Sequence, residues 1–274
     1  MKKILLAFDG CHFSEGAFEF ARTLNDASQV LLTGVFSPLI DYSGLWSYSV
    51  GVGATVVVPT LEDDDADAVE KNIDRFVFLC QLHNIEYRVH KDFSDFALQA
   101  LKKESRFADL LILGSESFYA NTLGGDGGTY LKEAVHSVEC PVLVVPEKFI
   151  FPKNNVLAYD GSESSVYAIK QFAYLFPELT ANNTLLVYVH EGEEDTFPEE
   201  DNIKELCARH YTALTLFRLD LNPKKYFGLW ANEREGALLV SGAFGRSSLS
   251  RAFSRSFVDE IVRERKLPLF ITHQ

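Results

Sequence analysis

The heptapeptide ILLAFDG at residues 4–10 has a near copy, NVLAYDG, at residues 155–161. In each copy an apolar run ends in Asp-Gly, and Ser- and Glu-rich residues and then an amphipathic stretch follow it. Each copy therefore predicts a strand, a turn and a helix. The length of 274 residues, at about 150 residues per domain, also suggests two domains. We expect the chain to contain one structural unit twice.

Two further pairs of segments occur in the same order in both halves. ADLLILG at 108–114 matches GALLVSG at 236–242, and CPVLVV at 140–145 matches LPLFIT at 267–272. These runs are short and continuously apolar, which is typical of strands buried on both faces of a parallel sheet. Helical patterns lie between them, at residues 69–83, 94–103, 130–138, 203–211 and 257–265.

Alternating strands and helices predict an α/β fold made of two tandem doubly wound parallel-sheet domains. Pro146 and Pro152 interrupt the chain between the two halves, so the boundary is expected within residues 147–155. The predicted domains are residues 1–148 and residues 153–274.

The composition is that of a globular protein, with 47% hydrophobic and 24% charged residues. No apolar run reaches the roughly 18 residues of a membrane span, and no cleavage-site pattern follows Met1. Neither a membrane helix nor a signal peptide is therefore expected. The four cysteines are scattered and form no CxxC pair, which indicates neither a zinc site nor a disulfide framework. A cytoplasmic location is the simplest one.

The net charge of −13 argues against general nucleic-acid binding, because neutralising phosphates needs clustered Lys and Arg. The charge is uneven, however. Residues 1–150 carry 12 basic and 22 acidic side chains, whereas residues 201–274 carry 12 basic and 8 acidic ones. If the protein binds an anion, the site is therefore expected in the C-terminal part of the chain.

Motifs for metals and nucleophiles are weak. The acidic runs at 62–65 and 191–201 lack the spacing of a calcium loop and have the composition of solvated loops. The seven histidines show no HExxH motif or paired spacing. Cys11-His12 follows the first strand, but adjacency does not by itself define a catalytic geometry. No metal site and no catalytic residue is predicted.

Ligands of open parallel sheets bind at the carboxyl ends of the strands, where the strand order reverses. The most informative loop at such an end begins with Gly242 and Gly245, which allow the backbone to approach a ligand, and continues with Arg246, a donor for phosphate. Further on, residues 254–256 read Ser-Arg-Ser just before a helical pattern, and helix starts favour phosphate. The other loops that follow predicted strands are 9–10, 114–117 and 160–162.

With these landmarks in order along nearly the whole chain, the sequence resembles a tandem universal stress protein of the UspA type. That family has an adenine nucleotide alpha-hydrolase-like fold. Its nucleotide-binding members carry Gly, two residues, Gly, nine residues, then Gly and Ser or Thr after the fourth strand, with an Asp ending the first strand. The resemblance implies that the second repeat binds ATP or AMP, with Mg, through Asp160, Val189, Gly242, Gly245, Arg246, Ser247, Arg255 and Ser256.

Both repeats depart from the family pattern. In the second repeat Arg255 stands in place of the third glycine, where its side chain either obstructs the site or reaches the phosphates with Arg246. In the first repeat Ser117 replaces the second glycine, and Glu116 would place a carboxylate against a phosphate. The first repeat is therefore predicted not to bind ATP in the manner of the family.

Plainer roles remain open for these residues. Asp9 and Asp160 suit the capping of the helices that follow them, and Gly242 and Gly245 suit a tight turn. The leading hypothesis is a stress-response protein that binds an adenine nucleotide in its second repeat and acts through a protein partner. The alternative is a nucleotide-independent interaction protein in which both pockets have decayed. Slow ATP hydrolysis is a weaker hypothesis, because no general base is evident.

The resemblance also implies how the two repeats associate. Sheets of this family commonly pair through their last strands, so residues 142–145 and 269–272 are expected to pair within the chain as an internal pseudo-dimer. That pairing would cover two edges that would otherwise be exposed. A homodimer of the whole chain stays open.

Overall fold

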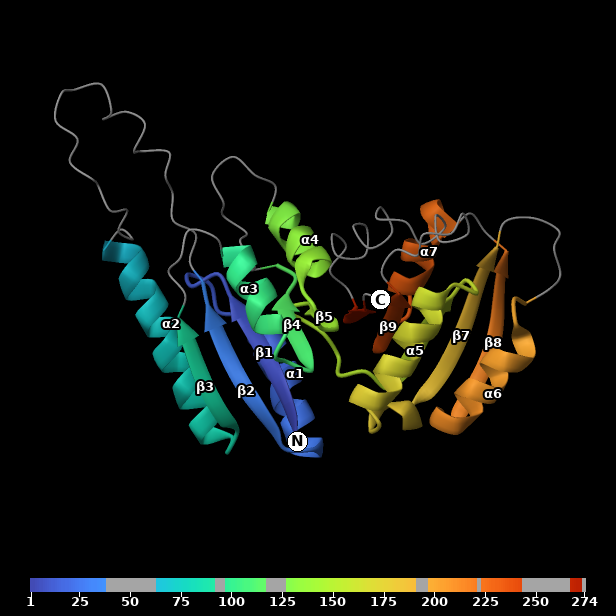
Figure 1. Cartoon of the computed structure of the whole chain (residues 1–274), viewed down its shortest axis with the longest axis horizontal. Coiled ribbons are helices and arrows are strands. Elements are labelled where there is room, and N and C mark those ends of the chain that lie inside the picture. Colours follow the sequence, from blue (N-terminus) through green and yellow to red (C-terminus); the bar gives the residue numbers. More distant parts are fainter. Residues whose placement is uncertain are drawn as a thin grey trace, which may run out of the picture.

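The computed structural model of the chain describes residues 1–37, 63–91, 97–116, 127–190, 197–220, 223–242 and 267–272. It contains one 10-stranded sheet, in the order β3-β2-β1-β4-β5-β10-β9-β6-β7-β8, with helices on both faces (Figure 1). The strands are β1 Lys2–Phe8, β2 Val30–Phe36, β3 Glu86–Lys91, β4 Leu110–Gly114, β5 Val142–Val145, β6 Asn154–Tyr159, β7 Asn183–His190, β8 Ala213–Asp220, β9 Ala237–Gly242 and β10 Leu269–Thr272. The helices are α1 Glu15–Ala27, α2 Asp63–Leu82, α3 Ala97–Ser105, α4 Gly127–Ser137, α5 Glu163–Leu175, α6 Glu200–His210 and α7 Pro223–Asn232.

The strand order is the same in the two halves of the sheet. Strands β1 to β5 form the first half and β6 to β10 the second, and neighbouring strands within each half are parallel. In each half the first strand lies between the second and the fourth, so the strand order reverses beside β1 and beside β6. These two places are where a doubly wound sheet binds its ligands.

The two halves join through β5 and β10, which pair antiparallel with Leu143 opposite Phe270. The expected pairing of the last strands within one chain is therefore confirmed. Phe270 also contacts the rings of Phe172 in α5 and of Phe176 directly after it, so the junction is packed as well as hydrogen-bonded.

Each strand contributes to two cores because successive side chains point to opposite faces of the sheet. Ile4, Leu6 and Phe8 of β1 pack in the core under α1, α2, α5 and α6, whereas Leu5 and Ala7 pack in the core under α3, α4 and α7. Burial on both faces explains why the strands are continuously apolar in the sequence.

The predicted helices within the described residues are present, with shifted ends. Helix α2 begins at Asp63, so part of the acidic run at 62–65 forms a first helical turn, where carboxylates are favoured by the helix dipole, and the expectation of a loop there is wrong. Helix α7 has no counterpart among the predictions, because its aromatic residues and Gly228 are weak helix formers. The helical pattern at 257–265 lies outside the described residues.

The described residues contain neither a candidate membrane helix nor a candidate metal-binding cluster. No helix there is long and apolar enough to cross a membrane. No cluster of His, Cys, Asp and Glu in this part of the chain could hold a metal ion.

Candidate functional site

Asp160 lies at the carboxyl end of β6, beside the reversal of strand order in the second half. The residue is 5% exposed, and its Oδ1 accepts a hydrogen bond from Ser162 N at 2.9 Å. Gly161 takes the left-handed region, φ +77°, which a residue with a Cβ adopts only with strain. The cap of α5 is Ser162, whose Oγ accepts from Ser165 N at 3.2 Å. The suggested capping role therefore belongs to Ser162 and not to Asp160.

Gly242 ends β9, the strand that pairs with β6 at this reversal. A Cβ on Gly242 would lie 2.4 Å from Ser164 O and 2.8 Å from Ser165 N, both in the first turn of α5. Because these are backbone atoms, the strand end can approach the helix only without a side chain at this position. Close packing on α5, beyond a tight turn, thus explains this glycine.

An aromatic cluster that the sequence analysis missed packs beside the turn at Asp160. Tyr159 donates a hydrogen bond from its hydroxyl to Pro198 O at 2.8 Å, and its ring stacks on Phe197 with centroids 5.4 Å apart. Phe197 also contacts Tyr188 at 5.3 Å. Burial raises the pKa of Tyr159 to about 12, so the hydroxyl stays protonated and remains a donor. The sequence offered one signal for this cluster, the aromatic Tyr159 at a strand end and Phe197-Pro198 within the acidic run at 191–201. That acidic run indicated only a solvated loop.

Of the remaining predicted residues of this site, Val189 lies within the described residues and the others do not. Val189 lies at the carboxyl end of β7, as expected, and its backbone is in register with Leu219 of β8. The structure does not test the other predictions, since Gly245, Arg246, Ser247, Arg255 and Ser256 lie outside the described residues.

Asp9 occupies the matching place in the first half but has different partners. Its Oδ2 lies 2.7 Å from His12 Nδ1, a hydrogen bond to the carboxylate, and its Oδ1 accepts from His12 N at 2.8 Å. The cap of α1 is Ser14, whose Oγ accepts from Ala17 N, so capping is not the role of Asp9 either. The matching carboxylates therefore differ in role: Asp9 forms an Asp–His pair in the first half, and Asp160 stabilises a turn in the second.

Glu116 follows β4 in the first half, where the sequence predicted a carboxylate facing a phosphate. In the structure Glu116 Oε2 accepts from Ser115 Oγ at 2.6 Å and from Glu147 N at 2.9 Å. The carboxylate is thus directed at the end of β5, where it holds the chain that leaves the sheet. Gly114 ends β4, as Gly242 ends β9, whereas Ser117 lies outside the described residues.

Solved structures with the same architecture cover the whole chain. A universal stress protein from Archaeoglobus fulgidus DSM 4304 matches 100% of this chain and 96% of its own, with 17% identity and a TM-score of 0.69. This chain has the universal stress protein fold. A putative universal stress protein from Pseudomonas aeruginosa UCBPP-PA14 shares the fold over 100% and 93% of the two chains, with 12% identity and a TM-score of 0.56. A functionally unknown protein from Pseudomonas aeruginosa PAO1 shares it over 100% and 92%, with 13% identity and a TM-score of 0.56. At these identities the likeness concerns the fold alone, and no protein-family model or curated protein matches the sequence.

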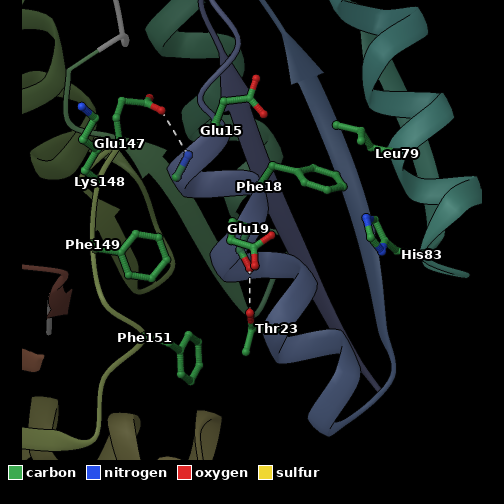
Figure 2. A pocket seen from close by; sticks show the side chains of 11 residues that line it. Glu15, Phe18, Glu19, Thr23, Leu79, His83, Glu147, Lys148, Phe149 and Phe151 are labelled. Carbon is green, nitrogen blue, oxygen red and sulfur yellow. Dashed lines mark hydrogen bonds between the residues drawn. The ribbon is translucent and has the colours of Figure 1, made fainter.

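A groove of about 540 Å³ lies elsewhere on this universal stress protein fold, along the outer side of α1 (Figure 2). Phe18, Phe149 and Phe151 give it apolar walls, and Glu15 and Glu19 give it acidic ones. The two carboxylates pair with Arg75 and Arg22 respectively. Since the groove is lined by α1, the end of α2 and residues 147–151, and not by the ends of β6 and β9, it is not the predicted nucleotide site.

Proposed function

We propose that this chain is a cytoplasmic stress-response protein that binds an adenine nucleotide in its second half. The observation that carries the proposal is the packing of Gly242 on the first turn of α5, beside Asp160 on the neighbouring strand. This packing holds the end of β9 against the start of α5 at the reversal of strand order, which is where a doubly wound sheet binds its ligands and where a helix start favours anions.

The chemistry of the flanking residues suits a nucleotide. The Asp160 carboxylate accepts hydrogen bonds and so suits the hydroxyls or amino group of a nucleoside. Arg246 suits the phosphates, with the hydroxyls of Ser247 and Ser256, and Val189 suits the base. Arg255 joins the phosphate contacts in this proposal. Magnesium would accompany the phosphates of ATP.

The first half is proposed not to bind ATP, because both oxygens of the Asp9 carboxylate are hydrogen-bonded to His12, whereas Asp160 is hydrogen-bonded to Ser162 N through Oδ1. Glu116 is held by Ser115 and Glu147. The two halves are proposed to be separate structural repeats, residues 1–148 and 153–274, of which one kept its ligand site.

The test begins with protein purified without added nucleotide. Denatured protein is expected to release ATP, ADP or AMP, and calorimetry is expected to detect ATP binding. Asp160→Asn should weaken binding by about tenfold or more, because it removes a charged acceptor. The matched control Asp9→Asn should leave binding unchanged. Finding no released nucleotide and no heat of binding at millimolar ATP, or equal effects of the two substitutions, would reject the proposal.

One observation favours a second candidate, a nucleotide-independent interaction protein. Phe197-Pro198 packs directly on the turn beside Asp160: a Cβ at Gly161 would lie 2.8 Å from Pro198 Cβ. If this segment occupies the place of the adenine base, capture of a protein partner should be insensitive to ATP and to Asp160→Asn. Capture that responds to either change favours the nucleotide-binding function instead.

A further inference from the structure

The groove along the outer side of α1 is separate from the proposed nucleotide site. Its volume of about 540 Å³ lies within the range of about 300–1,000 Å³ that small-molecule pockets have. Its lining comes from α1, from the end of α2 and from residues 147–151, which we call the connecting segment because it joins the two halves (Figure 2). Three parts of the fold that are distant in the sequence thus form one concave surface.

The connecting segment is held firmly against α1. The backbone N of Gly16 donates a hydrogen bond to Glu147 Oε2 at 3.1 Å. Further along, the ring centroids of Phe149 and Phe151 lie 5.5 and 5.0 Å from that of Phe20, which is fully buried. The groove is therefore formed before any ligand binds, and a preformed site loses less conformational entropy on binding.

Both sides of the groove have apolar walls. Phe149 and Phe151, both half-buried, line it from the connecting segment, and Leu79 lines it from α2. Phe18 contributes from α1, where its ring packs against that of His83 with centroids 6.4 Å apart. Aromatic rings bury apolar groups and also attract cations to their faces. These walls therefore suit a ligand with an apolar body, whether it is neutral or positively charged.

The charges that line the groove are mainly negative. Three carboxylates line it, those of Glu15, Glu19 and Glu147, together with one ammonium group, that of Lys148. The side chains of Glu15 and Glu19 are each 52% exposed, so a ligand in the groove can reach them. An excess of carboxylates attracts a cation and repels an anion.

Glu19 is the best placed of these carboxylates. Figure 2 shows it on α1, between the connecting segment with Phe149 and the end of α2 with Leu79. Its ion-pair partner Arg22 also pairs with Asp26, so one guanidinium serves two carboxylates. A carboxylate can also accept more hydrogen bonds than one arginine donates to it. The hydrogen bonds from Arg22 hold the pKa of Glu19 below its ordinary value, so Glu19 is ionised at neutral pH.

We propose that the groove along α1 binds an amphipathic organic cation, a small molecule with a protonated amine and an aromatic or aliphatic body. The amine would pair with Glu19, and the body would pack against Phe149 and Phe151. The same aromatic walls suit both parts of such a ligand, since they bury its body and attract its charge. A neutral ligand of the same shape would use the apolar walls alone, and an anion would meet the carboxylates.

Three probes of one shape and different charge test this proposal on the full chain. They are phenylpropylamine, which is a cation at neutral pH, the neutral phenylpropanol, and the anion phenylpropanoate. Titration followed by the backbone amide resonances measures each affinity and shows where the probe binds. We expect the amine to bind at millimolar concentration and to shift resonances of α1 and the connecting segment. The alcohol should bind about fivefold or more weakly, and the anion should not bind.

Two substitutions on α1 provide a matched pair. Glu19→Gln should weaken binding of the amine by about threefold or more and leave binding of the alcohol unchanged. The control is Asp26→Asn, because Asp26 pairs with the same Arg22 and is equally exposed, at 52%, but does not line the groove. This control should bind the amine like the wild type. Lys148→Gln removes the positive charge of the lining and should strengthen binding of the amine by about twofold.

Three results would overturn the proposal. They are no binding of the amine at millimolar concentration, an alcohol that binds as tightly as the amine, and equal effects of Glu19→Gln and Asp26→Asn. The second of these results would indicate a neutral apolar ligand instead. The experiment uses no nucleotide, so its outcome is independent of the proposed function.

Discussion

Replacing Gly242 by Ala tests the junction on which the proposed site depends. The new Cβ would lie 2.4 Å from Ser164 O, 2.5 Å from Ser164 C and 2.8 Å from Ser165 N. Ordinary contacts are about 3.5 Å, so the strand end and the helix must separate by about 1 Å. No flexible side chain can absorb this shift, because all three atoms belong to the backbone.

Two opposing effects decide the sign of the change in stability. Alanine reduces the conformational entropy of the unfolded chain, which favours folding by about 0.4–1 kcal/mol. Overpacking of a closely packed site disfavours folding by about 1–3 kcal/mol. We expect the second effect to dominate, so that the free energy of unfolding falls by about 1–2 kcal/mol.

Urea denaturation of the two proteins measures this difference, with an unchanged slope showing that the same surface unfolds. ATP affinity should fall as well, because the loop that begins at Gly242 is displaced. The control is Gly236→Ala: Gly236 has φ +68°, but the nearest atom to a new Cβ is Ile150 Cγ2 at 3.9 Å. Backbone strain there is expected to destabilise by about 1 kcal/mol without changing ATP affinity. A Gly242→Ala protein as stable as the wild type would refute the reasoning.

Three other predictions concern parts of the chain outside the site. Gly16→Ala should lower the free energy of unfolding by about 1 kcal/mol or more in urea denaturation, because the new Cβ would lie 2.1 Å from Pro146 O. This holds although alanine is normally the better helix former. A gain in stability would contradict the prediction. A thiol reagent should label Cys11 rapidly in the native protein and the other cysteines only after unfolding, and labelling of all of them at one rate would be incompatible with the structure. Cys80, Cys140 and Cys207 are buried, and burial raises the pKa of each thiol from 9.0 to about 12. The folded state therefore disfavours the ionised thiols. Urea denaturation should show the free energy of unfolding falling as the pH rises from about 9 towards 12.

Much of the fold could be predicted because the repeated unit carries local signals. The runs at 4–8 and 156–159 are continuously apolar because both faces of their strands are buried, so two-sided burial can be recognised in the sequence. The pairing of residues 142–145 with 269–272, expected from the family resemblance, was confirmed for a related reason, since each run would otherwise expose an apolar edge.

Parts of the candidate site were not predicted, because the partner of each carboxylate depends on the exact geometry of its turn or on a neighbour far along the chain. Asp9 and Asp160 stand at matching places in the repeat, yet one binds His12 and the other the Ser162 backbone. The partner of the Glu116 carboxylate is Glu147 N, which β5 brings to it. Helix α7 was missed because tertiary packing of Phe227 and Ala231 outweighs its weak local preference.

The sequence alone therefore determined the repeated strand–turn–helix unit, the alternation of strands and helices and the unequal charge of the two halves, since each is a property of neighbouring residues. The tertiary structure decided why Gly242 must lack a side chain and which partners the carboxylates of Asp9, Asp160 and Glu116 have. Contacts such as those of Gly242 with Ser164, or of Glu116 with Glu147, arise only when the packing of the sheet brings these segments together. Contact across the fold, rather than order along the chain, distinguishes the two halves.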